Sequence, residues 1–150
     1  MRTSLLFFLA AATSLAAPPA LAAQASELPC ASYATFERKG SNTELIGLAI
    51  GDLPAGSKVS MTCSGADCSF ASRSLTMKNN VKTLGLTDMF ADPNFKPGTI
   101  LEIQVTKPGW IGKSFKYEIM SSADPRATTE CLAADGSKTV ACKLKEGSGR

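Results

Sequence analysis

The sequence predicts an all-β protein built as a small immunoglobulin-like β-sandwich. Three observations support this fold class. Short segments alternate between apolar and polar residues, glycine and proline turn signals separate these segments, and no long helical pattern follows the first twenty or so residues. About seven short strands in one small domain are typical of an immunoglobulin-like sandwich. A small β-barrel is the alternative fold that the same pattern allows.

The chain begins with the features of a cleavable signal peptide. Arg2 supplies a positive charge, an apolar run follows it to about Ala17, and small residues stand at Ala20 and Ala22. The run is too short to cross a bilayer, which needs about 20 apolar residues. We therefore expect cleavage after Ala22 and a secreted or cell-envelope protein that is not held in a membrane after cleavage.

We expect four regions along the chain. Residues 1–22 form the signal peptide, 23–42 an N-terminal segment, 43–120 the β-sandwich domain, and 121–150 a C-terminal linker, cysteine hairpin and tail. A turn is expected at residues 51–56, a hairpin turn at 78–80 and a single helical turn at 87–90. The expected strands cover residues 33–38, 43–50, 58–63, 70–77, 81–86, 101–105 and 115–119.

The last two expected strands form the clearest hairpin, and side-chain parity limits its register. Opposed residues lie on the same face of a sheet, so Leu101 must face an odd-numbered partner such as Tyr117. The connecting loop must therefore hold an odd number of residues, three or five. A three-residue loop would set Glu102 opposite Lys116. Such a pair of opposite charges stabilises a sheet by at most ~1 kcal/mol.

The cysteines are disulfide candidates, because an exported protein of this size is oxidised outside the cytoplasm. The alternative is a four-cysteine zinc site. Zinc ligands usually come in pairs spaced by two to four residues, and the second pair here is much farther apart. We therefore expect no metal. The five cysteines are Cys30, Cys63, Cys68, Cys131 and Cys142.

Two local cysteine pairings are geometrically easy, although the sequence alone does not fix the connectivity. Cys63 and Cys68 close a tight loop that contains a glycine. Cys131 and Cys142 close a hairpin with an Asp-Gly turn. We favour both as disulfides, which leaves Cys30 as a free thiol or as a bridge to another chain.

Two groups of motifs carry a resemblance to a known module. A Gly-x-Leu-Pro-x-Gly motif at residues 51–56 precedes the Cys-x4-Cys loop, and a Lys-Pro-Gly-Thr motif at 96–99 precedes Pro-Gly-x-Ile-Gly-Lys at 108–113. Together they resemble an uncharacterised β-rich, immunoglobulin-like module of bacterial extracellular proteins, over about residues 45–142. The resemblance implies an extracellular location and a β-sandwich. Its motifs consist of turn residues, core residues and cysteines, so it implies no catalytic or binding residue.

The composition excludes several kinds of chemistry. The chain has no histidine, which removes Ser-His-Asp and Cys-His nucleophile systems and histidine-ligated zinc. The formal net charge is +3, with basic and acidic residues mixed along the chain and no basic stripe of the kind that nucleic acid requires. The chain also lacks a phosphate-binding glycine loop, and we expect no cofactor.

Three side chains remain as functional candidates. Glu102 and Glu118 could act as a pair of carboxylates in acid–base catalysis, although two solvent-facing charges are the simpler interpretation. Trp110 stands in a Pro-Gly loop, where it could stack against a sugar or anchor a partner. Its alternative role is to fold back and cap one end of the sandwich.

The leading hypothesis is a non-enzymatic secreted or cell-envelope module that acts by binding or by structural presence. Its partner would be a cell-envelope polysaccharide or another extracellular protein. One alternative is a small envelope hydrolase that uses Glu102 and Glu118. Another is a secreted inhibitor-like protein whose Cys131–Cys142 hairpin inserts into a partner.

Overall fold

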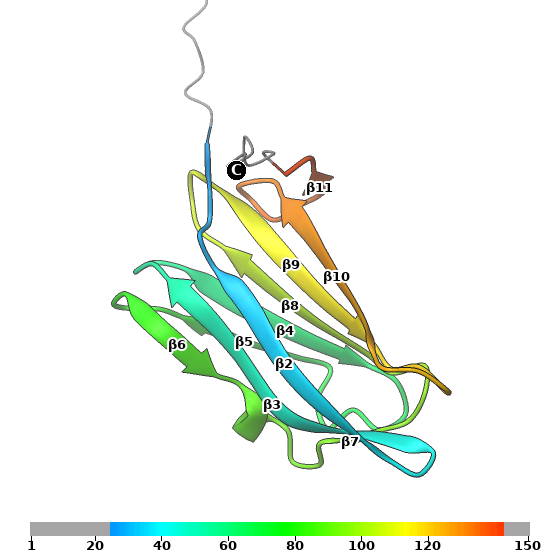
Figure 1. Cartoon of the computed structure of the whole chain (residues 1–150). Helices are drawn as coiled ribbons and strands as arrows, with labels where there is room; N and C mark the ends of the chain where they lie inside the picture. Colours follow the sequence, from blue (N-terminus) through cyan, green and yellow to red (C-terminus); the bar gives the residue numbers. More distant parts are fainter. Residues whose placement is uncertain (1–24, 143–150) are drawn as a thin grey trace, which may run out of the picture.

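The protein consists of two β-sheets packed face to face (Figure 1). The computed structural model describes residues 25–142, so the expected signal peptide and the tail at 143–150 lie outside the described residues. Within the described range, none of the helices has the length and hydropathy to cross a membrane. The all-β prediction is confirmed, and the strands form two separate sheets in place of one closed barrel.

The larger sheet has seven strands. Its strand order is β11-β10-β9-β8-β4-β5, and β1 pairs with β9 in parallel. All of its other pairs are antiparallel, as a meander of short connections allows. Its strands are β1 (Ser26–Glu27), β4 (Lys58–Ser64), β5 (Ser72–Thr76), β8 (Ile100–Thr106), β9 (Trp110–Glu118), β10 (Arg126–Leu132) and β11 (Thr139–Val140).

The smaller sheet has four strands, in the order β2-β3-β6, with the short β7 also paired to β3. A single 3-10 turn, η1 (Thr87–Met89), follows β6, at the place where the sequence predicts one helical turn. The strands of this sheet are β2 (Ala31–Lys39), β3 (Asn42–Leu53), β6 (Val81–Gly85) and β7 (Asn94–Phe95).

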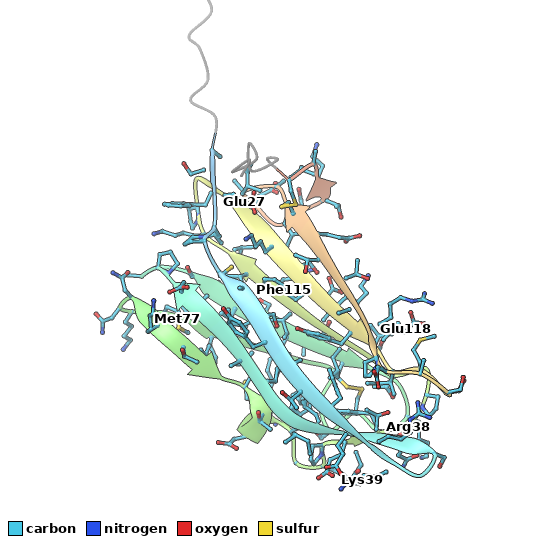
Figure 2. All side chains as sticks on the ribbon, viewed as in Figure 1. Glu27, Arg38, Lys39, Met77, Phe115 and Glu118 are labelled. Atoms are coloured by element: carbon cyan, nitrogen blue, oxygen red, sulfur yellow. A yellow bond between two sulfur atoms is a disulfide. The ribbon has the colours of Figure 1, made fainter. Side chains whose placement is uncertain are left out.

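The core lies between the two sheets and follows the period of two that a strand imposes on its side chains. Leu101, Ile103 and Val105 of β8 are each fully buried, while the polar residues between them face outward. Ile50 of β3 is fully buried from the other sheet, and Figure 2 shows Phe115 between the layers. Burying one such aliphatic side chain contributes roughly 1.5–3 kcal/mol.

The register of the β8–β9 hairpin agrees with the parity argument. Leu101 pairs with Tyr117, and Glu102 pairs with Lys116. The apolar faces of both strands therefore point into the core together. Three residues separate the end of β8 from the start of β9.

The expected hairpin around residues 78–80 is wrong. β5 pairs with β4 in the larger sheet, whereas β6 pairs with β3 in the smaller sheet. The buried Met77 marks the crossing: its amide donates to the Ser57 carbonyl, and the chain then leaves the β4–β5 pair. Alternation along a strand identifies its buried face but carries no information about its partner. The sequence pattern of two successive strands is therefore the same whether they pair with each other or lie in different sheets.

Several expected boundaries also differ from the structure. β2 begins at Ala31 and pairs with β3 along its whole length, so the sandwich includes part of the expected N-terminal segment. β3 continues through Gly51 to Leu53, where a turn was expected. β10 pairs with β9 over seven positions, so the larger sheet extends beyond residue 120 into the expected linker.

A matched pair of glycine substitutions tests this packing. Gly112 lies in β9, where an added Cβ would come 2.7 Å from the Val105 carbonyl oxygen. We expect Gly112→Ala to destabilise the protein by about 1–3 kcal/mol through overpacking, measured by urea unfolding. A Cβ added at Gly85 of β6 would have no other atom within 4 Å, so Gly85→Ala should change the stability by less than about 1 kcal/mol. Equal losses of stability in the two variants would contradict the close contact between Gly112 of β9 and Val105 of β8.

Candidate functional site

The most exposed large hydrophobic side chain in residues 25–142 is Tyr33 of β2, at 61% exposure. Its neighbours in the strand show which way it points: Ser32 accepts a hydrogen bond from the core residue Tyr117, and the Phe36 ring lies 5.6 Å from the Tyr117 ring. Because side chains alternate along a strand, Tyr33 points to the outer face of the smaller sheet.

The Tyr33 ring covers a bare stretch of backbone. A Cβ added at Gly51 would lie 3.1 Å from Tyr33 Cε2 and 3.6 Å from the carbonyl oxygen of Lys82, so the ring packs closely on this glycine. The ring therefore rests on the sheet, and the rest of its surface is open to solvent. A ring supported in this way loses little conformational freedom when a ligand covers it.

The outer face around this ring has few large side chains. Register places Ala49 opposite Tyr33, and it places Thr83 and Gly85 of β6 on the far side of β3. The exception is Ile46, which is 48% exposed at the irregularity in the β2–β3 pairing. We call this flat surface the tyrosine face, defined by Tyr33, Gly47, Ala49, Gly51, Thr83 and Gly85.

A hollow of about 360 Å³ lies at the end of β3, next to the tyrosine face. Lys82 Nζ donates a 2.9 Å hydrogen bond to Asp52 Oδ1 across it. The Asn80 side-chain oxygen accepts a hydrogen bond from the Ala55 amide, which leaves the Asn80 amide donors directed elsewhere. We call it the polar hollow, lined by Asp52, Leu53, Pro54, Asn80, Val81 and Lys82.

The electrostatics of the polar hollow depend on one ion pair. The pKa of Lys82 is raised, chiefly because its ammonium group donates a hydrogen bond to Asp52 and then because of the negative charge of Asp52. The Lys82 side chain is 90% exposed and the Asp52 side chain 49%, so the two form a surface ion pair with both groups accessible to a ligand. Asp52 has φ 55° and is the one non-glycine residue of the described chain in the left-handed region. Such conformations cost energy and cluster at functional sites.

Trp110 is placed differently from Tyr33. It starts β9, is half-buried and packs against the core cluster. Lys107 Nζ lies 5.1 Å from the centroid of its ring, in a cation–π contact. This environment corresponds to the capping role considered for Trp110, and it leaves less free aromatic surface than Tyr33 offers.

The two candidate carboxylates each have partners on the outer face of the larger sheet. Glu102 accepts hydrogen bonds from Gln104 and from Ser114, at 2.9 and 2.7 Å. Burial raises the pKa of Glu102, but these hydrogen bonds and the charge of Lys116 outweigh it, so the pKa lies below its usual value. Glu118 forms an ion pair with Arg126 at 3.5 Å. A lowered pKa is the opposite of what a general acid needs.

The structure contains both of the favoured disulfides, Cys63–Cys68 and Cys131–Cys142, and leaves Cys30 as a free thiol. Cys30 is 1% exposed, and burial raises its pKa to about 11. A buried, protonated thiol is a poor nucleophile and a poor candidate for a bridge to another chain.

One cluster of metal-ligating residue types lies at the C-terminal disulfide. Glu27, Cys131 and Cys142 bring their ligand atoms within 4.8 Å of one another. The two sulfur atoms are bonded to each other, so they offer no thiolate to a metal. The Glu27 carboxylate forms an ion pair with Lys113 at 3.1 Å.

The hairpin closed by Cys131 and Cys142 packs back onto the larger sheet. A Cβ added at Gly136 in its turn would lie 3.0 Å from Thr106 Cγ2, so the turn rests on the end of β8. The Ala133 amide also donates to the Lys138 carbonyl across the loop. The loop is therefore compact, whereas an inhibitor-like insertion would need it to project.

In comparisons with known proteins, no family model, curated protein or solved structure matches this chain. The site must therefore be judged on its own geometry. The sequence pointed to Trp110 and not to Tyr33, because Tyr33 stands within an expected strand and not in a turn or loop. The signal that could have found the tyrosine face is the run Gly47, Ala49 and Gly51 at alternate positions, which leaves one face of β3 almost without side chains.

Alkylation of the native protein tests the environment of Cys30. Its pKa rises from the ordinary value of 9.0 to about 11, so the thiolate fraction at about pH 8 falls roughly a hundredfold. We expect iodoacetamide to modify Cys30 at least about a hundredfold more slowly in the native than in the urea-unfolded, unreduced protein. The intact mass of the unfolded, unreduced protein after reaction should show one modified cysteine and two disulfides.

The same shift sets a pH dependence. Because the folded state holds the Cys30 proton more tightly, its contribution to stability is complete below pH 9.0 and is lost as the pH rises through about 11. The Cys30→Ala variant should lack this part of the decrease in stability at high pH. Rapid alkylation in native buffer would contradict the buried placement.

Proposed function

We propose that this protein is an exported, non-enzymatic β-sandwich module that binds an uncharged polysaccharide of the cell envelope. The observation that carries the proposal is the exposed Tyr33 ring resting on Gly51 beside the polar hollow. Aromatic rings pack against the apolar C–H faces of sugars, and tyrosine adds a hydroxyl at the wet edge.

The polar hollow supplies groups of the type that sugar hydroxyls need. Asp52 can accept a hydrogen bond, Lys82 can donate one, and Asn80 has an amide that donates. A few placed polar groups beside an apolar surface are the usual composition of a small-ligand site. Because Asp52 and Lys82 neutralise each other, the hollow favours an uncharged ligand over an anionic one.

Export and an immunoglobulin-like arrangement belong to the same proposal. The N-terminal sequence has the pattern of a signal peptide, and two disulfides in a small domain are typical of an oxidising compartment. Two packed, mostly antiparallel sheets, with chain crossings between them, support an immunoglobulin-like sandwich. The resemblance to bacterial extracellular modules agrees with both.

Substitution of Tyr33 tests the proposed function. We expect the wild-type protein to bind at least one member of an array of neutral glucan, mannan and N-acetylglucosamine oligosaccharides. Tyr33→Ala should weaken that binding at least about tenfold, because the stacking surface is lost. Tyr33→Trp should retain it, since a larger ring can use the same support. Affinity can be measured by calorimetry or by titration of backbone amide resonances.

Thr62→Ala provides the control, because Thr62 is an exposed strand residue on the outer face of the larger sheet, away from the tyrosine face. It should leave both folding and binding unchanged. The proposal fails if no neutral oligosaccharide binds at about 1 mM. It also fails if Tyr33→Ala binds as tightly as the wild-type protein.

A further inference from the structure

β2 is an edge strand of the smaller sheet, and nothing in its first six residues protects that edge. Within residues 25–142 it pairs only with β3, so the backbone groups on its other side have no strand partner. Residues 31–36 read Ala-Ser-Tyr-Ala-Thr-Phe, without a charge, a proline or a glycine. Soluble proteins usually place such a residue on an exposed edge to prevent pairing with another chain.

The other edges of the described sheets carry this protection. β5 has Arg73, which pairs with the buried Met61 and therefore points to the inner side, and its guanidinium lies 4.8 Å from the Phe70 ring centroid. β6 is five residues long and carries Lys82. β11 is only two residues long. The rest of β2 carries Glu37, Arg38 and Lys39, and the free part of β10 carries Arg126 and Glu130. Residues 31–36 are therefore the longest stretch of free edge in the described chain without a charge, a proline or a glycine.

The larger sheet extends beyond β2 on this side. The contacts of Tyr117 with Ser32 and Phe36 place β2 over β9. β10 lies next to β9, with Ala127 opposite Tyr117 and Thr129 opposite Phe115, so both residues face the inner side. Yet Ala127 and Thr129 are exposed, because no strand of the smaller sheet covers them.

A groove of about 250 Å³ occupies the uncovered corner between the two sheets. Figure 2 shows Arg38 at the end of β2, where its guanidinium donates to the Ser121 and Ala123 carbonyls and fixes the loop at the lower end of the groove. We call it the inter-sheet groove, lined by Ala34, Phe36, Tyr117, Asp124, Pro125 and Ala127. It lies where the next strand of the smaller sheet would be.

The space favours a single strand over a second copy of the protein. In an antiparallel pair of copies joined through β2, both cores would lie on the same side of the joined sheet. In each copy, β9 lies under β2. The partner's β2 would lie above β10 of this copy, so the partner's β9 and this copy's β10 would need the same position. Stacked sheets are about 10 Å apart, and this spacing leaves no room for both strands. One extended segment, with no second layer of its own, fits.

We propose that the free edge of β2 binds an extended peptide segment of a partner protein by β-strand addition. The backbone of the segment pairs with residues 31–36, and its alternate side chains enter the inter-sheet groove. The groove presents apolar groups from Phe36, Pro125 and Ala127 and polar groups from Tyr117 and Asp124, so a mixture of small apolar and hydroxyl side chains suits it. Main-chain hydrogen bonds supply most of the affinity in this mode of recognition. The surface is separate from the tyrosine face, which lies on the outer side of β2.

An alternating Thr-Val octapeptide, acetylated and amidated, tests this proposal by titration into the full mature chain. Because the backbone carries the affinity, the identity of the natural partner is not needed. We expect the peptide to shift the amide resonances of residues 31–36 and of Ala127, and to slow exchange of the outward amides of β2. The same peptide with N-methyl groups on alternate residues should not bind, since it cannot pair with a strand edge.

Two variants complete the test. Ala127→Arg fills the groove from an exposed position and should weaken peptide binding at least about tenfold. Thr128→Arg, next to it on the outer face, should bind as the wild type does. The proposal is overturned if about 1 mM peptide leaves residues 31–36 unchanged, or if Ala127→Arg binds normally. A β2-mediated dimer of the chain, detected by sedimentation, would overturn the assignment of the occupant.

Discussion

The structure depends on the packing of the inner faces of the two sheets against each other. Leu101, Ile103 and Val105 of β8 are fully buried from one sheet, and Leu48 and Ile50 of β3 are buried from the other, in the same hydrophobic cluster. These alternating buried side chains fix the register of the neighbouring strands, because a shift of one residue would move every side chain of a strand to the opposite face. They also join sheets of unequal width, because the larger sheet is six strands across and the smaller sheet is three strands across. The larger sheet therefore extends beyond the smaller one.

The inter-sheet groove follows from this inequality, whereas the tyrosine face follows from the small residues on the outer face of β3. The smaller sheet has one face on the core and one face in solvent, and the outer face is kept nearly bare by Gly47, Ala49 and Gly51, with Tyr33 resting on it. The edge of the same sheet stops above β9, which leaves the inner side of β10 uncovered. We propose the tyrosine face for a flat sugar and the inter-sheet groove for an extended peptide.

The sequence was sufficient for local features and insufficient for pairings between distant segments. Alternation identified the strands around Val59, Ile103 and Tyr117, parity limited the β8–β9 register to odd loop lengths, and short spacing favoured both disulfides. The crossing at Met77 was missed, because hydrophobic alternation does not identify a strand's partner. The tyrosine face was missed for a related reason: the surroundings of Tyr33 come from β3 and β6, and only the register brings them together.

Amide hydrogen exchange, resolved by residue, tests the unequal sandwich most directly. Amides at the centre of β8 and β9 should exchange only through global unfolding, because both strands are paired on both sides. Along Ala31–Phe36, the amides that face β3 should be protected, and the alternate amides on the free edge should exchange at least about a hundredfold faster. Uniform protection of every amide in β2 would contradict the free edge and, with it, the unequal widths of the two sheets.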